Sequence, residues 1–303
     1  MSGTVAVVCH DAGGAEIVSS WLRQQPQPKV QLVLDGPAVY IFEKKMALGV
    51  RTSLADAIEA CDWVLCGTSW QSELERRAIA LAKKRGKKVV AFLDHWVNYQ
   101  DRFVQAGQLI LPDELWVGDE DAFVLARECF AGLPVTLQVN SYFEDIIVEF
   151  ADLDPVPSSD CDVAVLYVCE PVSEHCEKEY GDPRHLGYTE QEALRFFLRS
   201  LGHLVHGVQR IIIRPHPSEK DDKYDWVMSE FELPIEISKR GSLLAEIAQV
   251  HMVAGCESMA MVVGILTGRR VVSSIPPGGR KCRLPQRSIQ HLGWPEKQVS
   301  ADG

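Results

Sequence analysis

The sequence lacks the features that mark several large classes of protein. Its nine cysteines are an odd number without a Cys-x-x-Cys pair, so we expect reduced thiols rather than a disulfide framework or a zinc site. No apolar run approaches the ~20 residues that span a bilayer. The first residues show neither a basic region nor a small-residue cleavage site. We therefore expect a cytoplasmic protein without a transmembrane segment.

Basic residues are also in the minority. The 303 residues include 31 Lys and Arg against 42 Asp and Glu, a net charge of −11. An extended nucleic-acid surface needs a basic face, so we expect no nucleic-acid partner. A local cluster of Lys and Arg that holds a phosphate remains compatible with this balance. The 46% hydrophobic and 24% charged residues are typical of a globular protein, and the length allows two domains of ordinary size.

Short apolar runs alternate with helical stretches along the whole chain, with no short-period repeat. Strands are predicted at 4–9, 30–34, 63–66, 88–93, 115–117, 163–169, 210–214, 235–237, 251–254 and 270–274. Helices are predicted at 15–24, 54–60, 70–85, 119–130, 189–206, 221–230, 242–248 and 257–267. Buried strands that alternate with helices are typical of a parallel sheet covered on both faces.

An acidic segment with two prolines, 151–162, separates the two halves and has the composition of a linker. We predict an α/β fold of two Rossmann-like domains facing a cleft. The domains are an N-terminal acceptor-side domain over 1–152, a C-terminal nucleotide-side domain over 161–275, and a tail over 276–303 that can pack back on the first domain. Ligands of open α/β sheets bind beyond the carboxyl ends of the strands, so the residues that follow each strand are the candidate site.

The strands of the first half are followed by glycines and hydroxyl groups. The first strand leads into Asp11, Gly13 and Gly14 at a helix start, which favours an anion; the alternative is a plain turn in which Asp11 caps the helix. The Gly-x-Gly-x-x-Gly dinucleotide fingerprint is absent here. The hydroxyls of Thr68 and Ser69 follow a later strand, where they either bind a ligand or cap the next helix.

The densest group of polar and aromatic side chains follows the strand at 88–93. It comprises Asp94, His95, Trp96, Tyr99 and Arg102. These residues supply a general base and rings that can stack on a sugar or a nucleobase, although a buried structural network could also explain them. Asp35, in an Asp-Gly-Pro turn after the second strand, is a weaker signal.

In the second half, the sharpest motif is Arg214-Pro215-His216-Pro217-Ser218, directly after a strand. The two prolines restrict the backbone on both sides of His216, and the Arg, His and Ser side chains can hold phosphate oxygens. A rigid surface turn is the alternative.

Residues that could bind a nucleotide follow two further strands of the second half. At the first, Gly255 permits close backbone approach, and the helix start at Glu257 and Ser258 presents N–H groups to a phosphate. Glu257 either accepts bonds from ribose hydroxyls or offsets the helix dipole. Ser273 and Ser274 follow the last predicted strand.

These motifs resemble glycosyltransferases of the GT-B type. The His216-Pro217 pair after a strand, and the Glu257-Ser258 helix start, resemble bacterial sialyltransferase, Kdo-transferase and CDP-glycerol-transferase families. The resemblance implies that His216 binds the nucleotide phosphate and that Ser258 supplies a hydroxyl clamp. Bacterial sialyltransferases also carry an acidic-acidic-Gly motif that supplies the base. The nearest match, Leu34-Asp35-Gly36, lacks the first acid, so the base stays open.

The resemblance implies a metal-independent, cofactor-free glycosyltransferase that moves a sugar from a nucleotide donor, such as a CMP-activated nonulosonate or Kdo-like acid, to a glycan or other hydroxyl acceptor. The candidate bases are Asp11, Asp35, Asp94 and His95. The candidate nucleotide-binding residues are Arg214, His216, Ser218, Gly255, Glu257, Ser258, Ser273 and Ser274. The candidate acceptor-binding residues are Gly13, Gly14, Thr68, Ser69, Trp96, Tyr99 and Arg102.

Two alternatives remain open at this point. A nucleotide-sugar hydrolase or 2-epimerase of the same fold would use the same donor site. A non-catalytic nucleotide-sugar-binding protein would keep the fold and bind without turnover.

Overall fold

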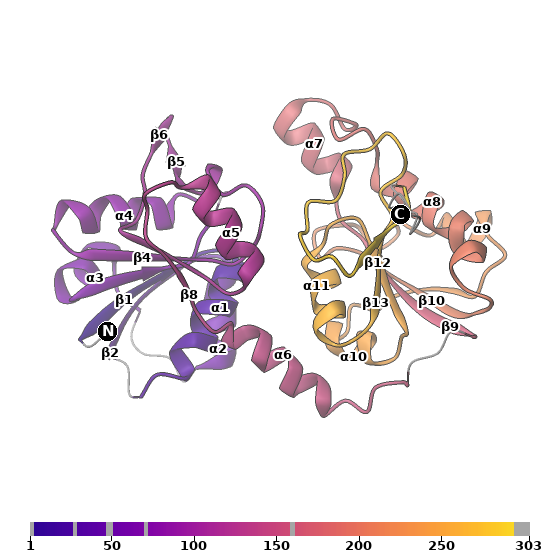
Figure 1. Cartoon of the computed structure of the whole chain (residues 1–303), viewed down its shortest axis with the longest axis horizontal. Coiled ribbons are helices and arrows are strands. Elements are labelled where there is room, and N and C mark those ends of the chain that lie inside the picture. The colour runs from indigo at the N-terminus through magenta and orange to yellow at the C-terminus, as the bar shows by residue number, and fades with distance from the viewer. Residues whose placement is uncertain (1–2, 27–28, 47–50, 70–71, 158–160, 294–303) are drawn as a thin grey trace, which may run out of the picture. The chain divides into compact units, whose positions relative to one another are not determined.

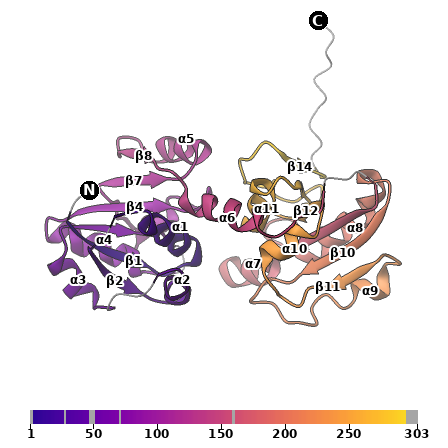
Figure 2. The ribbon, with the colours of Figure 1, turned by 90° about the horizontal axis from the view of Figure 1, so that it is seen from below.

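The chain folds into two α/β units, each built on a parallel sheet (Figure 1). The structure, a computed structural model, describes residues 3–26, 29–46, 51–69, 72–157 and 161–293. The units are Met1–Asp145 and Ile146–Gly303. Each contains a sheet of six parallel strands among the described residues, with helices on both faces (Figures 1 and 2). The α/β class predicted from the sequence, with one parallel sheet in each half, is confirmed.

The first unit places its earliest strand, β1, next to the edge strand β2, in the order β2-β1-β3-β4-β7-β8. These strands are β1 (Thr4–Cys9), β2 (Lys29–Leu34), β3 (Trp63–Cys66), β4 (Lys88–Leu93), β7 (Glu114–Val117) and β8 (Val135–Leu137). The helices are α1 (Ala12–Arg23), α2 (Pro37–Lys45), α3 (Leu54–Ala60), α4 (Leu74–Lys84), α5 (Glu120–Cys129) and α6 (Ser141–Ala151), which extends into the second unit. A 3-10 turn (Asp101–Phe103) and a small hairpin, β5 (Val104–Gln105) and β6 (Gln108–Leu109), follow β4.

Aromatic side chains fill the core on one face of the first sheet. Trp21 of α1 lies 5.0 Å from Trp116 and 6.4 Å from Trp63, measured between ring centroids. Phe92 meets Trp116 edge-on at 5.8 Å. Such large rings dominate the apolar area that a core buries, so they fix α1 against β3, β4 and β7. The loops at the carboxyl ends of these strands are thereby held on a rigid frame.

The second unit is also built on six parallel strands, but its earliest strand, β9, is the third in the order β11-β10-β9-β12-β13-β14. Its strands are β9 (Val163–Val168), β10 (Val208–Arg214), β11 (Ile235–Ile237), β12 (Met252–Gly255), β13 (Arg270–Ser273) and β14 (Ile289–His291). Its helices are α7 (Val172–Tyr180), α8 (Glu190–Leu204), α9 (Val227–Glu230), α10 (Leu243–Ala248) and α11 (Met259–Leu266). A Thr189–Glu192 capping box starts α8.

The linker and the tail differ from the sequence-based expectation. Helix α6 continues to Ala151, and Val156 after it donates its N–H to the Ala248 carbonyl at 2.9 Å. The tail, for which packing on the first domain was one possibility, contributes β14, which extends the second sheet by pairing with β13. Only one of the three residues of β14 is apolar, so the sequence pattern did not predict this strand. Residues 158–160 of the predicted linker and 294–303 of the tail lie outside the described residues.

Helix boundaries also differ in places. The helix predicted at 221–230 is reduced to α9, because the residues before it form turns. The helix predicted at 70–85 begins at Leu74; residues 70–71 lie outside the described residues. Helices α2, α6 and α7, strands β8 and β14 and the hairpin were not predicted. In the part of the chain that the structure describes, no helix has the length and apolarity to cross a membrane.

Candidate functional site

The carboxyl end of β1 brings an imidazole and a carboxylate together. His10 Nδ1 lies 2.7 Å from Asp11 Oδ1, and both side chains are about one-quarter exposed, at 26% and 24%. Asp11 stands at the N-cap position of α1, but its side chain makes no capping hydrogen bond. Because an ionised carboxylate only accepts, the contact favours a proton on Nδ1 and leaves Nε2 as the basic atom. Sequence reasoning did not select His10.

Gly36 packs against the Nε2 side of the His10 ring, where there is no room for a side chain. A Cβ added at Gly36 would lie 2.7 Å from His10 Nε2, and Gly36 has a φ of +52°, which disfavours other residues. Asp35 before it is exposed and accepts the Gly36 N–H at 2.8 Å within its own turn. The Asp-Gly pair singled out in the sequence therefore borders the His10 ring.

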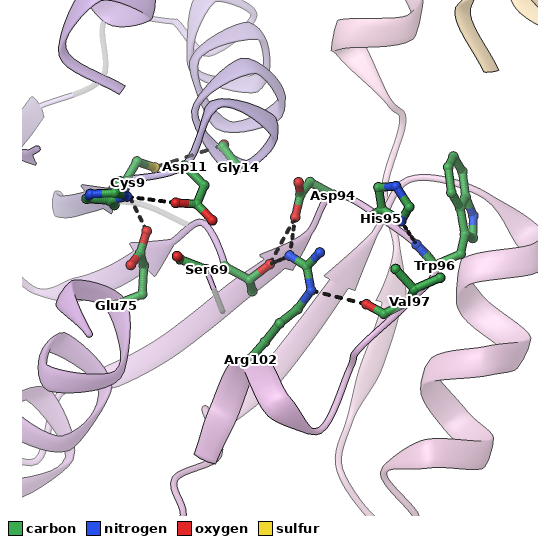
Figure 3. Close-up of polar contacts among 12 residues, drawn as sticks. Cys9, Asp11, Gly14, Ser69, Glu75, Asp94, His95, Trp96, Val97 and Arg102 are labelled. Carbon is green, nitrogen blue, oxygen red and sulfur yellow. Dashed lines mark hydrogen bonds and ion pairs between the residues drawn. The ribbon is translucent and has the colours of Figure 1, made fainter. Parts of the chain in front are cut away.

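A buried ion pair follows β4 (Figure 3). Arg102 donates to Asp94 Oδ1 at 2.7 Å, and their side chains are only 7% and 13% exposed. Thr68 also donates to Asp94 Oδ1, at 3.0 Å, and accepts from Arg102 at 2.7 Å. Asp94 is thus held by two donors, one of them charged, inside the unit. Ser69 is buried beside this group and accepts the Ser72 N–H at 2.8 Å.

The adjacent glycines of the first loop are explained by close packing. A Cβ at Gly13 would lie 1.9 Å from Asp94 Oδ2, and one at Gly14 would lie 3.0 Å from the Gly67 Cα. Any larger residue would displace the Asp94 carboxylate or push α1 off β3. Gly13 and Gly14 were predicted to bind the acceptor; the structure uses their missing side chains to seat α1 against the strand ends.

The aromatic residues after β4 are enclosed rather than offered to a ligand. Trp96 and Tyr99 are each 6% exposed. The Trp96 indole N–H donates to Asp119 at 3.0 Å, and the Tyr99 ring stacks on Phe130 at 6.4 Å. Burial raises the pKa of Tyr99. His95 Nδ1 accepts the Trp96 main-chain N–H at 3.0 Å. The contacts of Trp96 and Tyr99 therefore favour a role in a buried structural network over stacking on a sugar.

Glu75, at the start of α4, is a buried carboxyl that sequence reasoning missed (Figure 3). It is 2% exposed, and its Oε1 accepts the His10 main-chain N–H at 2.7 Å. Its Oε2 is buried without a hydrogen-bond partner among the described residues. Burial raises the pKa of Glu75 to about 7, above the ordinary value of 4.5, although the His10 N–H opposes the shift. Only its 65-residue separation from His10 concealed it, since nothing local distinguishes it from other charged residues of the helix.

Replacing Glu75 by Gln should flatten the pH dependence of stability. In the folded chain the raised pKa keeps Glu75 protonated up to about pH 7, whereas the unfolded carboxyl ionises near 4.5. The folded state therefore binds more protons between these values, and stability falls as the pH rises through this window. Between pH 4.5 and pH 8, the free energy of unfolding of Glu75→Gln should rise by about 3 kcal/mol relative to that of the unmodified chain. Urea unfolding of both proteins at both pH values measures this. The same stability difference between the two proteins at both pH values would contradict a buried, protonated Glu75.

In the second unit, the turn after β10 holds the His216 main chain firmly. The His216 N–H donates to Glu219 Oε2 at 2.7 Å. Glu219 Oε1 accepts from the Tyr224 hydroxyl and from Lys223, both at 2.8 Å. The Glu219 side chain is fully buried, whereas His216 and Ser218 are exposed. The prolines, the buried carboxylate and its donors thus present an exposed imidazole on a fixed backbone.

Lys223 joins three carboxylates beneath this turn. Its ammonium lies 2.5 Å from Glu174, 2.7 Å from Glu190 and 2.8 Å from Glu219. Burial alone would lower the pKa of Lys223, but hydrogen bonds to the three carboxylates raise it. The same three carboxyl groups lie close enough to hold a metal ion, but the ammonium already lies among them.

Arg214 does not join His216. It donates to Glu246 of α10 at 2.7 Å, and the pair is half-buried. Ser238 also donates to Glu246, so this carboxylate ties the ends of β10 and β11 to α10. The prediction that Arg214 faces a phosphate is therefore not supported by its contacts.

A carboxyl group fills the helix start that was predicted to hold a phosphate. Glu170 Oε1, after β9, accepts the N–H groups of Cys256 at 3.1 Å and Glu257 at 2.8 Å. Burial raises the pKa of Glu170 to about 7. The Ser258 hydroxyl accepts the Ala260 N–H at 3.2 Å as the N-cap of α11, so it acts as a cap here. Sequence reasoning identified the helix end but not its internal occupant.

The remaining predicted nucleotide-binding residues form hydrogen bonds to other residues of the protein. Glu257 accepts from Arg280 at 2.7 Å and from Arg283 at 2.8 Å. Burial alone would raise the pKa of Glu257, but these arginines lower it. Ser273 and Ser274 are buried and donate to the carbonyls of Cys256 and Gly255, at 2.8 and 3.0 Å. They fix the loop after β12 rather than facing a ligand.

Register nevertheless gathers these loops at one edge of the second sheet. Arg214 pairs with Val168 across β10 and β9, and Gly255 pairs with Ser273 across β12 and β13. Gly255 lies so close to β9 that an added Cβ would be 2.9 Å from the Val168 carbonyl oxygen. The His216 turn, Glu170 and the start of α11 thus follow neighbouring strands, where open α/β sheets bind their ligands.

Comparison with known proteins gives similarity in fold. No protein-family model and no curated protein matches the sequence. Among solved structures, the UDP-GlcNAc 2-epimerase from Methanocaldococcus jannaschii is similar, with a TM-score of 0.56 and 12% identity over 89% of this chain and 83% of that chain. The glycotransferase of kitacinnamycin is similar with a TM-score of 0.51 and 13% identity over 96% of this chain and 86% of that chain. The chain therefore has the two-unit GT-B fold.

Proposed function

We propose that the chain is a glycosyltransferase that takes a sugar from a nucleotide donor and transfers it to a hydroxyl acceptor. The observation that carries this proposal is the exposed His216, held on a rigid turn at the carboxyl end of β10. The fold that the chain shares with a glycosyltransferase and a sugar-nucleotide epimerase supports a nucleotide sugar as the ligand. The finer donor class, a CMP-activated nonulosonate or Kdo-like acid, rests on the His-Pro motif.

On the donor side, His216 is the group that contacts the departing phosphate, and the Ser218 hydroxyl lies 2.7 Å from its Nδ1. Both are exposed and both follow the strand end where ligands of such sheets bind. A donor aimed at the phosphate oxygens stabilises negative charge that develops as the glycosidic bond breaks. Lys220 in the same turn is exposed and adds a positive charge nearby.

On the acceptor side, His10 is the base, and Asp11 orients it. The contact of 2.7 Å between Nδ1 and Asp11 leaves Nε2 to take the proton of the acceptor hydroxyl. Two of the other candidates, Asp94 and Asp35, are less suited. Asp94 is held by Arg102 and Thr68, and Asp35 is exposed within its own turn.

A thermal-shift panel tests this proposal. The panel contains CMP, CDP, UMP, UDP, GDP, CMP-N-acetylneuraminate and UDP-N-acetylglucosamine, each added to the full chain. A ligand that binds only the folded state at one hundred times its Kd stabilises by about 2.7 kcal/mol, which should raise the melting midpoint by several degrees. We expect at least one nucleotide to do so. A midpoint unchanged by every member would overturn the proposed function.

A further inference from the structure

The hydrogen bonds around His216 fix which ring nitrogen carries its proton. His216 Nδ1 lies 3.2 Å from the main-chain nitrogen of Ser218, which donates to it, and 2.7 Å from the Ser218 hydroxyl. A main-chain N–H can only donate, so Nδ1 must offer its lone pair. In a neutral imidazole the proton then lies on Nε2, and Nε2 makes no hydrogen bond to any residue that the structure describes.

We propose that His216 serves the donor phosphate as a neutral imidazole, donating a hydrogen bond from Nε2, and that Ser218 and Glu219 are the positioning residues that select this form. This inference rests on the proposed function for the identity of the ligand, but the form of the ring is a property of the protein alone. It makes His216 a directed hydrogen-bond donor rather than a counter-charge.

The charged groups that face the ring are compatible with the neutral form. Desolvation of the ring by its surroundings lowers the pKa of His216 below 6.5, and the positive charges of Arg240 and Lys223 lower it further. The negative charge of Glu219 opposes them. Lys223 neutralises part of that charge through its contact at 2.8 Å, and Arg240 donates to the Glu219 carbonyl at 2.6 Å. Around pH 7 and above, the ring is therefore neutral.

Glu219 acts on the ring through the main chain. Its Oε2 accepts the His216 N–H at 2.7 Å, while the Tyr224 hydroxyl and Lys223 hold its Oε1. The carboxylate therefore fixes the turn that brings the Ser218 N–H under Nδ1. Pro215 and Pro217, on either side of His216, further restrict the backbone conformations of this turn.

Nitrogen NMR of the full chain tests the form of the ring directly. Long-range proton–nitrogen correlation spectra of ¹⁵N-histidine protein at pH 7.5 distinguish a protonated Nε2 from a protonated Nδ1, and His216→Ala assigns the signal among the nine histidines. We expect Nε2–H. Ser218→Ala is a matched control that keeps the main-chain donor and should keep this form. A protonated Nδ1, or an imidazolium at pH 7.5, would overturn the inference.

Amide replacements test the role of Nε2 in binding. A Gln amide nitrogen reaches the region of Nε2, whereas an Asn amide nitrogen reaches that of Nδ1. With CMP-N-acetylneuraminate and UDP-N-acetylglucosamine as probes, His216→Gln should stay within a few-fold of the original Kd. His216→Asn and His216→Ala should both weaken binding about tenfold or more. Equal losses for Gln and Asn would overturn the inference. Binding of neither probe to the unmodified chain would instead count against the proposed donor classes, with the NMR result unaffected.

Discussion

Replacing Lys223 by Met should destabilise the second unit by about 3–5 kcal/mol and lower its melting midpoint by on the order of 10 °C. The Lys223 side chain is 11% exposed and compensates Glu190 and Glu219, whose side chains are 6% and 0% exposed. Removing one partner of a buried ion pair leaves uncompensated charge, which costs more than the pair itself contributes. Thermal unfolding followed by circular dichroism measures the effect.

The same variant should be less impaired in acid. Burial alone would raise the pKa of Glu190, but hydrogen bonds from Lys223 and Ser173 lower it, so the stability that this carboxylate contributes is lost as the pH falls through that lowered pKa. Without the ammonium, the carboxyl groups escape mutual repulsion by protonation. The deficit of Lys223→Met should therefore be larger at pH 7.5 than at pH 5. Lys220→Met, at an exposed position, is the control and should change stability by less than about 0.5 kcal/mol. Equal effects of the two substitutions would contradict the network.

Replacing Asp11 by Asn should lower kcat by about 10²–10⁴-fold and leave the donor Kd unchanged. An amide in place of the carboxylate can present its N–H₂ to His10 Nδ1, which selects the tautomer with the proton on the wrong nitrogen. Donor binding belongs to the second unit in this account, so calorimetry should find it intact. Nucleotide release in the presence of acceptor measures kcat.

Asp35→Asn is the matched control for this substitution. Asp35 is exposed and its side chain accepts only the N–H of its own turn. We expect kcat within a few-fold of the unmodified chain. A large loss at Asp35 with little loss at Asp11 would move the base to the Asp-Gly turn that the sequence resemblance indicated.

The sheets were predictable because their strands are runs of apolar residues. Strands such as Thr4–Cys9 and Val163–Val168 are buried along almost their whole length, and this leaves a signal in any short window. Strand Ile289–His291 and the helix Pro37–Lys45 carry weaker patterns and depend on tertiary packing. Tertiary context also shortened the predicted helix at 221–230, where Lys223 and Tyr224 turn inward to Glu219.

The positions of the strand-end loops were predictable, but the contacts of their side chains were not. Strand ends in the sequence indicated His216 and Asp11 correctly as loop residues, because topology alone places loops at the sheet edge. The hydrogen-bond partners of the other predicted binding residues come from distant parts of the chain. Glu170 reaches Glu257 across 87 residues, and Thr68 reaches Asp94 across 26. A single sequence holds no local trace of such pairs. Residues that would bind a phosphate could therefore not be distinguished from residues that bond to other parts of the chain.

The fate of the donor sugar distinguishes a glycosyltransferase from the alternatives. The full chain is incubated with CMP-N-acetylneuraminate or UDP-N-acetylglucosamine, with and without a mixture of glycan acceptors, and the products are resolved by mass spectrometry. We expect free nucleotide to be released together with a glycan whose mass has increased by one sugar, and only when acceptor is present. Hydrolysis or epimerisation of the donor at the same rate without acceptor would contradict it and favour a hydrolase or epimerase of the same fold.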